Sequence, residues 1–480
     1  MIQYVSTKGG VPPTPFDRAV LEGFAADQGL FVPQTLPRLS KQELMRLKPL
    51  SFPELAGEIL SLFIDPELIP RADLEQLISS SLAGFSAAAV LPLRPLKKTP
   101  NTWIMELFHG PTLSFKDLSM GFLIRVMDYL LKRENRHLNL LLATTGDTGP
   151  AAAHAVAESE AIDCWPLYPA GGISLEQEGQ MTGLQDDSVH PVRVSGCPDG
   201  VNDLDLVLGE IFGDAALKEK LQLSSVNSIN WCRVMFQAIH YFYGYFRVCD
   251  DFEETVVFSV PCGAFGNMFG GSLARMMGLP ISGFVCSVNR NHVLETVFST
   301  GLLKQEKLYQ TLSPAIDIIV PYNFWRYLYY LSGQNSGRIS TWMERFETTG
   351  ELQLPPDILD KMAQYHTAIS VSDETTLATI QHIFEAEGYL LDPHGAVALA
   401  GAESCATTFG QPVKTICLAT AHPAKFPNVI AQAVGSPLPR QAFHPSLLIP
   451  STHPAEAKSC PLPELYRYLV ADIEKRNSHG

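Results

Sequence analysis

The sequence lacks long apolar runs and clustered basic residues. No run of about 18 or more consecutive apolar residues occurs, which excludes the usual membrane-spanning helix. Its 35 Lys and Arg residues are outnumbered by 50 Asp and Glu residues and are nowhere clustered, for a formal net charge of −15. Because a nucleic-acid backbone attracts clustered positive charge, we expect no nucleic-acid partner and no membrane association.

Paired cysteines and metal-ligand clusters are also missing. The nine cysteines are scattered singly, without a C-x-x-C pair, so we expect reduced, packed thiols rather than zinc or redox sites. His394 and His422 have no second ligand four residues on, so both are predicted to be hydrogen-bonded structural histidines, and no metal site is expected. The first ten residues lack the basic start and apolar run of a secretory signal, which favours a cytoplasmic location.

The composition is that of a globular protein with more than one core. With 480 residues and 46% hydrophobic residues, the chain is long enough for roughly two or three domains. The pattern along the chain divides it into a mostly helical N-terminal subdomain (1–100), a smaller α/β domain (101–250), a larger α/β domain (251–435) and a Pro-rich C-terminal tail (436–480).

Short apolar runs followed by small-residue turns and helical patterns indicate the fold class. Such runs cover Leu138–Ala143, Thr255–Val260 and Thr415–Ala419, whereas residues 17–91 show helical spacing and the tail ends in an amphipathic segment near residues 465–473. Strand, turn and helix in repetition predict two doubly wound α/β domains with parallel sheets. In such sheets, ligands bind at the carboxyl ends of the strands, where these turns lie.

One lysine stands among apolar neighbours in the segment from Glu106 to Asp117. Lys116 follows Ser114 and Phe115, where an ammonium group is poorly solvated and its pKa should fall, as a Schiff-base lysine requires. Read alone, a lysine beside an aspartate equally fits an ordinary surface or ion-paired side chain.

Three turns carry further candidate residues. The hydroxyl-rich turn Thr144–Gly149, leading into a helix predicted to begin near Pro150, suits a carboxylate but also resembles an ordinary helix cap. The turn from Cys262 carries Gly263, Gly266, Gly270 and Gly271, which would let the backbone approach a phosphate or simply make a tight connection. Thr420 is either a ligand contact or a turn hydroxyl.

In their joint order these elements resemble the threonine synthases, fold type II pyridoxal-phosphate enzymes similar to the tryptophan synthase β chain, and specifically their long bacterial and fungal branch. The resemblance covers nearly the whole chain. Its most specific elements are Ser114-Phe115-Lys116-Asp117, Gly146-Asp147-Thr148-Gly149 and Thr420-Ala421-His422-Pro423-Ala424-Lys425-Phe426.

The resemblance implies a site and a reaction. Lys116 would hold pyridoxal 5'-phosphate through a Schiff base and move protons at the substrate's α and neighbouring carbons. The other cofactor-binding residues would be Phe115, Gly263, Ala264, Phe265, Gly266, Asn267 and Thr420. The substrate-binding residues would be Thr144, Thr145, Asp147, Thr148, Gly149, Ser174, Asn227, Ser228, Arg233 and Lys8. The implied reaction converts O-phospho-L-homoserine and water into L-threonine and phosphate by γ-elimination and β-hydration. The expected ligand is thus a small anionic amino acid, and the expected oligomeric state is a monomer or homodimer.

Several positions depart from the family's pattern. Ala264 replaces a usual Asn, Ala170 and Gly172 stand where basic residues are common, Lys8 replaces an Arg, and Pro314 interrupts the usual S-N-A-M-D. These departures leave two alternatives open. One is a threonine synthase-like paralogue that acts on another γ-substituted amino acid or releases 2-oxobutyrate, and the other is a regulatory or binding protein that keeps the fold without turnover.

Overall fold

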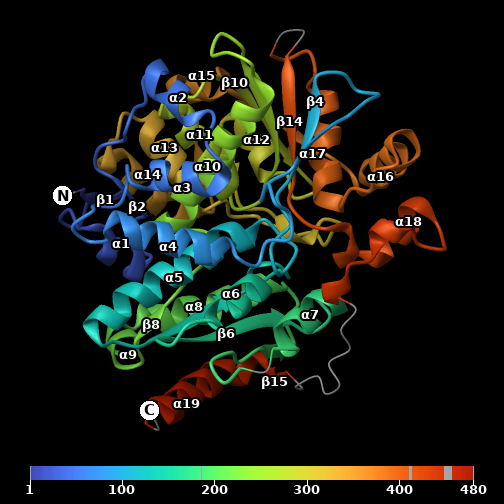
Figure 1. Cartoon of the computed structure of the whole chain (residues 1–480). Coiled ribbons are helices and arrows are strands. Elements are labelled where there is room, and N and C mark those ends of the chain that lie inside the picture. The colour runs from blue at the N-terminus through green and yellow to red at the C-terminus, as the bar shows by residue number, and fades with distance from the viewer. Residues whose placement is uncertain (1, 185, 410–412, 448–456, 479–480) are drawn as a thin grey trace.

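The chain folds around two open sheets, one in each half of the view in Figure 1. The computed structural model describes residues 2–184, 186–409, 413–447 and 457–478. The larger sheet has the order β13-β10-β9-β14-β4-β3, in which β3 and β4 run antiparallel and the other neighbours run parallel. Its strands are β3 (Leu93–Pro95), β4 (Thr102–Glu106), β9 (Val256–Pro261), β10 (Ile281–Val288), β13 (His366–Ser370) and β14 (Lys414–Ala419).

The smaller sheet has the order β15-β7-β6-β5-β8, with all neighbours parallel. Its strands are β5 (Leu138–Ala143), β6 (Ile162–Pro169), β7 (Val192–Ser195), β8 (Leu223–Ser224) and β15 (Lys458–Pro461). Every residue of β5 and of β9 is buried, as expected for strands covered by helices on both faces. The prediction of an α/β protein with parallel sheets is therefore confirmed.

Helices cover both sheets, and α10 (Trp231–Val248) is the most deeply buried of them. It packs against α3, α5 and α11, and its residues are buried almost all round, which explains why it is rich in apolar and aromatic residues. The other helices of the two sheets are α5 (Lys116–Glu134), α6 (Thr148–Val156), α7 (Leu175–Thr182), α8 (Val201–Gly213), α9 (Ala215–Lys220), α11 (Gly266–Met276), α12 (Val293–Thr300), α13 (Phe324–Leu331), α14 (Ser336–Thr349), α15 (Pro356–Ala363), α16 (Asp373–Glu387), α17 (Pro393–Ser404) and α18 (Pro427–Val434).

The N-terminal region is helical, as predicted. It contains α1 (Phe16–Glu22), α2 (Lys41–Leu47), α3 (Phe52–Leu60) and α4 (Arg71–Leu82), together with the short antiparallel pair β1 (Tyr4–Ser6) and β2 (Phe31–Pro33). Ser40 and Ser51 begin α2 and α3 with capping boxes, in which each serine and a glutamate three residues later bind each other's backbone N–H. Leu55 and Ile59 of α3 are fully buried, which joins this region to the main core.

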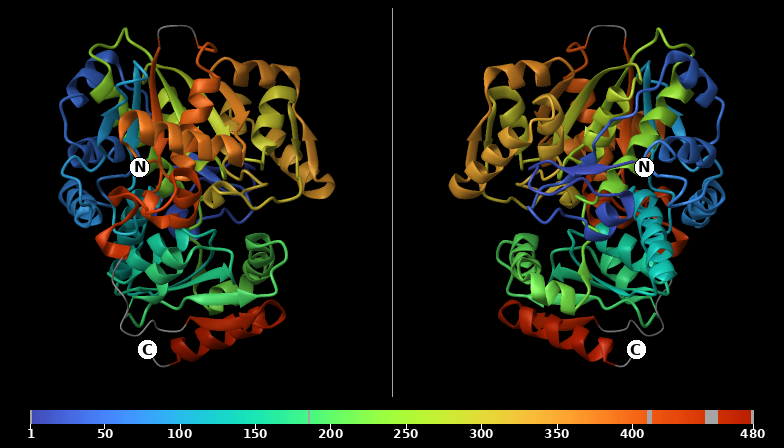
Figure 2. Two further views of the ribbon diagram at one scale, coloured as in Figure 1. Left: turned by 90° about the vertical axis from the view of Figure 1, so that its right-hand side faces the viewer. Right: turned by 90° about the vertical axis from the view of Figure 1, so that its left-hand side faces the viewer.

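The C-terminal tail contributes more than its sequence predicted. The amphipathic segment forms α19 (Leu465–Asn477), which buries Leu465, Leu469 and Ile473 against the smaller sheet. Before it, β15 pairs with β7 and forms one edge of that sheet, although no apolar run predicts a strand there. Figure 2 shows the red α19 beneath the smaller sheet, on the side away from the larger sheet.

Sheet membership does not follow the predicted domain boundaries, since β3 of the segment 1–100 lies in the larger sheet and β15 of the tail lies in the smaller sheet. β4 lies in the segment 101–250 that was assigned to the smaller domain, but it pairs with β14 in the larger sheet. The division of the chain into domains at residues 100, 250 and 435 stays a prediction. The nine cysteines are free thiols, as expected. Within the described ranges, no helix has both the length and the apolar character needed to cross a membrane.

Candidate active site

The carboxyl ends of strands from both sheets line one cleft of about 1860 Å³. From the smaller sheet come Thr145, after β5, and the segment Pro169 to Gly172, after β6. From the larger sheet come the turn Pro261 to Gly266, after β9, and Thr420, after β14. The cleft therefore lies where ligands bind in doubly wound sheets, and it gathers turns that are hundreds of residues apart in the chain.

Lys116 is the first residue of α5 and lines this cleft. The segment before it pairs with the segment after β14, because the Phe115 N–H donates to the Thr420 carbonyl at 2.8 Å and the His422 N–H donates to the Leu113 carbonyl at 3.0 Å. Leu113 has a φ of 62°, a left-handed conformation that turns the chain towards this pairing. The two motifs that the sequence singled out thus fix Lys116 beside Thr420.

The environment of Lys116 makes its amine reactive. Its side chain is almost fully buried, and its Nζ lies 3.9 Å from Asp147 Oδ2. Burial lowers the pKa of Lys116 to about 8; the Asp147 carboxylate opposes this effect, and the cations of Arg233 and Lys425 add to it. Only the neutral amine acts as a nucleophile or as a base. Slightly above neutral pH, Lys116 therefore carries a neutral amine in a large share of the protein molecules.

Asp147 is held by a second buried lysine. Lys425 Nζ lies 2.7 Å from Asp147 Oδ1 and also donates to the Thr112 carbonyl at 2.9 Å, and Gln177 Nε2 donates to the same carboxylate oxygen at 3.1 Å. Burial would raise the pKa of Asp147, but the ammonium groups of Lys425 and Lys116 hold it well below its usual range. Asp147 is therefore a permanent anion at the floor of the cleft.

The glycine-rich turn after β9 presents a free helix N-terminus to the cleft. Phe265 precedes α11 in the left-handed conformation, with a φ of 63°. The N–H groups of Gly266 and Asn267 donate to no residue in the described part of the chain. A Cβ at Gly263 would lie 2.8 Å from Ile318 Cγ1, so this position requires glycine. Such a turn is a ready-made site for a phosphate group.

Two buried polar atoms near this turn also lack a partner in the part of the chain that the structure describes. Asn267 accepts at Oδ1 from His240 Nε2 and from the Tyr241 hydroxyl, both at 2.9 Å, while its Nδ2 has no partner among the described residues. Gln237 Oε1, which also lines the cleft, is likewise unpaired within the described ranges. Buried polar groups normally have partners, so the free N–H groups and Asn267 Nδ2 fit a phosphate group in the cleft, whereas Gln237 Oε1, an acceptor, fits a donor of a bound group.

Six of the predicted substrate-binding residues line the cleft, namely Thr145, Asp147, Thr148, Asn227, Ser228 and Arg233. α6 begins at Thr148, two residues before the predicted start, because Pro150 is accommodated in the first turn, where a helix has no use for its missing N–H. Arg233 is 1% exposed and forms no ion pair with a described residue. Burial lowers its pKa to about 10, which leaves a cation that an anionic ligand would satisfy.

The other four predicted residues lie outside the cleft lining and have structural partners. Thr144 Oγ1 accepts from the N–H groups of Gly146 at 3.0 Å and of Gly149 at 2.9 Å, and so shapes the turn. A Cβ at Gly149 would lie 2.6 Å from Met181 Sδ, which makes this glycine a packing position. Two more positions are similarly engaged: Ser174 caps α7, and Lys8 is ion-paired with Glu347 at 3.7 Å.

The two histidines of these motifs are hydrogen-bonded, as predicted. His394 Nδ1 bonds Asp392 Oδ1 at 2.8 Å, and its Nε2 accepts from the Ala315 N–H at 3.1 Å. His422 Nδ1 accepts from the Ala424 N–H at 3.1 Å. Both rings therefore hold loops in place at the strand ends.

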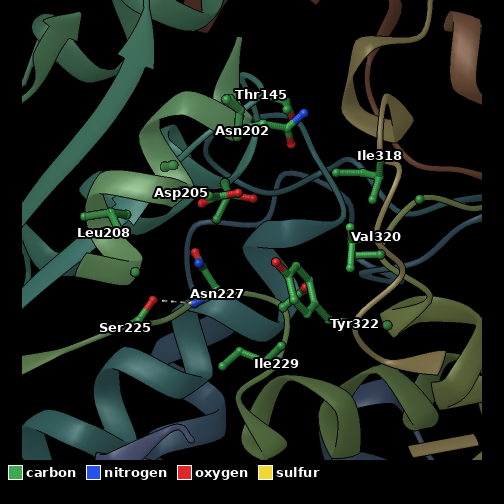
Figure 3. A pocket seen from close by; sticks show the side chains of 18 of the residues that line it. Thr145, Asn202, Asp205, Leu208, Ser225, Asn227, Ile229, Ile318, Val320 and Tyr322 are labelled. Atoms are coloured by element: carbon green, nitrogen blue, oxygen red, sulfur yellow. Dashed lines mark hydrogen bonds between the residues drawn. The ribbon is translucent and has the colours of Figure 1, made fainter. Parts of the chain in front are cut away.

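The mouth of the cleft has a different character. Figure 3 shows Asn202 and Asp205 of α8 on one side and Ile318, Val320 and Tyr322 on the other. Asp205 forms no hydrogen bond or ion pair with any residue of the described ranges, and burial raises its pKa to about 6. Burial and the Asp205 carboxylate also raise the pKa of Tyr322. Sequence reasoning missed Asp205 because one aspartate in an amphipathic helix gives no signal.

Models of known families match nearly the whole chain. Residues 3–82 match a threonine synthase N terminus, residues 86–420 a pyridoxal-phosphate dependent enzyme, and residues 395–450 a threonine synthase C-terminal region. The chain belongs to the threonine synthase family. Its cofactor is accordingly pyridoxal phosphate, and the resemblance inferred from the motifs is confirmed.

Individual members of the threonine synthase family extend this match. Threonine synthase of Schizosaccharomyces pombe is 36% identical over 466 residues, covering 91% of this chain and 90% of the relative. Threonine synthase-like 2 of Rattus norvegicus is 39% identical over 439 residues, covering 90% and 89%. The structure of pyridoxal-phosphate-bound threonine synthase from Brucella melitensis superposes with a TM-score of 0.90 at 33% identity, covering 98% and 99%.

Within this family's fold, the structure adds residues that the motifs did not assign. Lys425 lies in the Thr420–Phe426 element and could have been suspected from it, but its partner Asp147 lies in a turn of the other sheet. Asn323 donates from Nδ2 to the Ala264 carbonyl at 3.2 Å and to the Ser228 carbonyl at 3.1 Å. It thereby joins the glycine-rich turn to the loop that carries the predicted substrate residues.

Proposed function

We propose that the protein converts O-phospho-L-homoserine and water into L-threonine and phosphate. The observation that carries this proposal is the buried Lys116, whose amine lies 3.9 Å from the Asp147 carboxylate in a cleft that also receives two free helix N-termini, those of α6 and α11. A substrate with a carboxylate, together with a phosphate-bearing cofactor, needs two separate anion sites around one reactive amine, and this cleft offers them.

The cofactor residues follow from the fit described above. Lys116 would hold pyridoxal phosphate, and the N–H groups of the glycine-rich turn, Gly263 to Asn267, would bind its phosphate. Phe115 would pack near the ring, and the Thr420 hydroxyl would face the ring nitrogen. When bound, the cofactor supplies a sink for the electrons that remain on carbon when a proton leaves.

The remaining work falls to side chains of this chain. The neutral amine of Lys116 would remove and return protons at the α and β carbons of the substrate, since it lies on the floor of the cleft beside the cofactor's site. Thr145 and the N-terminus of α6 at Thr148 would hold the substrate carboxylate, where the N–H of Thr148 has no partner in the described ranges. Arg233, a buried cation without an ion pair to a described residue, would hold the substrate phosphate.

A second candidate is a lyase that eliminates phosphate and ends at 2-oxobutyrate and ammonia. Two observations favour it. The cleft wall at Ala170, Gly172 and Pro314 is uncharged where the family often has basic or polar residues, and relatives named threonine synthase-like 2 match as well as those named threonine synthase.

One assay separates the candidates. Purified protein, loaded with pyridoxal phosphate, is incubated with O-phospho-L-homoserine, and phosphate, threonine and 2-oxobutyrate are measured in the same sample. Threonine equal to phosphate supports the proposed function, whereas 2-oxobutyrate equal to phosphate supports the second candidate. No phosphate release above a protein-free control would overturn both. We also propose that the protein is cytoplasmic and is a monomer or a homodimer. Light scattering on the purified protein distinguishes the two oligomeric states.

A further inference from the structure

Lys425 is a fully buried cation that no motif assigned to the chemistry. It lies at the end of the 3-10 turn Pro423–Lys425 and has an exposed fraction of 0%. Its Nζ has two oxygen partners, Asp147 Oδ1 at 2.7 Å and the Thr112 carbonyl at 2.9 Å. An ammonium group removed from water is costly, so a fold keeps one where its charge is matched, and here the match is with a residue of the cleft floor.

The three charged groups stand in a row with unequal spacing. Asp147 turns Oδ1 towards Lys425 and Gln177, at 2.7 and 3.1 Å, and turns Oδ2 towards Lys116, at 3.9 Å. The closer ion pair is therefore the one with Lys425. With Lys425 and Asp147 paired, their charges cancel, and a proton on Lys116 adds an unmatched positive charge to a buried site.

We propose that Lys425 is a positioning residue which, by occupying Asp147 Oδ1, leaves the amine of Lys116 free to lose its proton. The role rests on the proposed function, in which Lys116 acts as a neutral base. Without Lys425, the carboxylate of Asp147 would turn fully to Lys116 and hold that proton in a short ion pair. Lys425 thus pairs with the Asp147 carboxylate, which would otherwise keep Lys116 protonated.

Other charged groups also face this row, and the cation of Arg233 lowers the pKa of Lys116 more than that of Lys425 does, but of these two cations it is Lys425 that pairs with Asp147 Oδ1. Arg233 acts on Lys116 from α10, and His394 acts on Asp147 from α17. Asp117 faces Lys425 from α5, but its carboxylate accepts from the Thr112 N–H at 2.9 Å.

Two further histidines face Lys425, and both are neutral at physiological pH. Burial lowers the pKa of His154 and of His422 to about 4, and Lys425 adds to this effect at both rings. Burial raises the pKa of Asp117 to about 6, against hydrogen bonds from Thr112. Between pH 7 and 9, roughly the range in which a lysine with a pKa of about 8 titrates, His154 and His422 are therefore neutral and Asp117 is largely ionised.

The test follows the proton on Lys116 by the rate at which full-length protein, freed of cofactor, takes up pyridoxal phosphate. Uptake needs the neutral amine, and the yellow absorbance reports it without any substrate. In Lys425→Met, which keeps the side-chain volume without the charge, the midpoint of the rate against pH should rise by about one unit, so that uptake at pH 7 slows about tenfold. Lys425→Arg should keep the midpoint near that of the wild type.

Two further variants keep the test decisive if Lys425→Met folds poorly. Asp147→Asn should move the midpoint below that of the wild type, and Lys425→Met with Asp147→Asn should cancel the rise seen with Lys425→Met alone. A wild-type midpoint in Lys425→Met of unchanged melting temperature, or in Asp147→Asn, overturns the proposal. So does an equal rise in Lys425→Arg, because the cause would then be packing and not charge.

The failure of this role and the failure of the proposed function give different results. If the midpoints shift as expected but O-phospho-L-homoserine yields no phosphate, the role of Lys425 stands and the proposed substrate is wrong. If threonine forms but the midpoints do not move, the proposed function stands and the role of Lys425 is wrong.

Discussion

The floor and the mouth of the cleft are built in opposite ways. On the floor, Lys116, Asp147 and Lys425 are each less than a tenth exposed and are linked by buried ion pairs. At the mouth, Tyr322 is 43% exposed and Asp205 has no hydrogen-bond partner among the described residues. A side chain with several buried partners has one orientation, whereas a side chain without partners can change without disturbing the fold. We therefore expect substitutions on the floor to change the chemistry and substitutions at the mouth to change substrate binding.

The departures from the family pattern follow the same division. Three of the departures, Ala170, Gly172 and Pro314, lie in the cleft wall. The first two lie in the loop after β6, and Pro314 begins a 3-10 turn. Ala264 lies closer to the floor, but its carbonyl accepts from Asn323 and its backbone keeps the turn in place. The four predictions below test the contrast between floor and mouth, beginning with the largest effect.

The strongest test of the floor is Lys116→Ala. Removing the amine should lower the rate of phosphate release by about 10⁴-fold, the upper range for loss of a positioned acid and base. Phosphate release with O-phospho-L-homoserine measures the effect, and an unchanged melting temperature shows that the fold is intact. A variant that keeps a tenth or more of the activity would mean that the chemistry lies elsewhere.

Arg233→Met tests the region between floor and mouth. Methionine fills most of the volume of the buried arginine but cannot pair with an anion, so KM for O-phospho-L-homoserine should rise by about 30-fold, as expected for loss of a charge-assisted contact of roughly 2 kcal/mol. The cofactor Kd should stay within about twofold of the wild-type value, since the proposed site for the cofactor phosphate is the glycine-rich turn and not Arg233. If the cofactor Kd rises and KM does not, Arg233 serves the cofactor instead.

Asn323→Ala tests the support of the glycine-rich turn. Loss of its hydrogen bonds to Ala264 and Ser228 should raise the Kd of pyridoxal phosphate by about tenfold, with kcat at saturating cofactor reduced by less than about threefold. Absorbance titration of the cofactor-free protein gives the Kd. The matched control is Asn335→Ala, which removes an exposed cap of α14 and should leave the Kd unchanged.

Asp205→Asn should give the smallest effect and is the direct test of the mouth. Burial raises the pKa of Asp205 to about 6, so its carboxylate is charged above that pH and repels an anionic substrate. The variant should lower KM about threefold at pH 8, the size of a partly solvated charge interaction, and leave KM unchanged at pH 5, where the carboxyl is already neutral. A rise in KM at pH 8 would show instead that Asp205 binds the substrate, and the contrast between mouth and floor would then be lost.

Much of this architecture could be predicted from the order of residues. The run Leu138–Ala143 predicts a strand and forms β5 with the same bounds. The run at 255–260 is offset from β9 by one residue at both ends, and the run at 415–419 begins one residue after the start of β14. These strands are buried on both faces, so their apolar runs are visible without any neighbour. The edge strand β15 has no such run, because its backbone pairing with β7 depends on a partner more than 250 residues away.

By itself, the sequence determined the family, the sheet type and the cofactor, and it predicted Lys116 as the lysine that would hold the cofactor, because each depends on short segments whose residues act together locally. The tertiary structure decided what surrounds that lysine. The pairing of Asp147 with Lys425 and the support of the turn by Asn323 each join segments from different elements. Charge and burial act through space and not along the chain, so the protonation of Lys116 is a property of the fold.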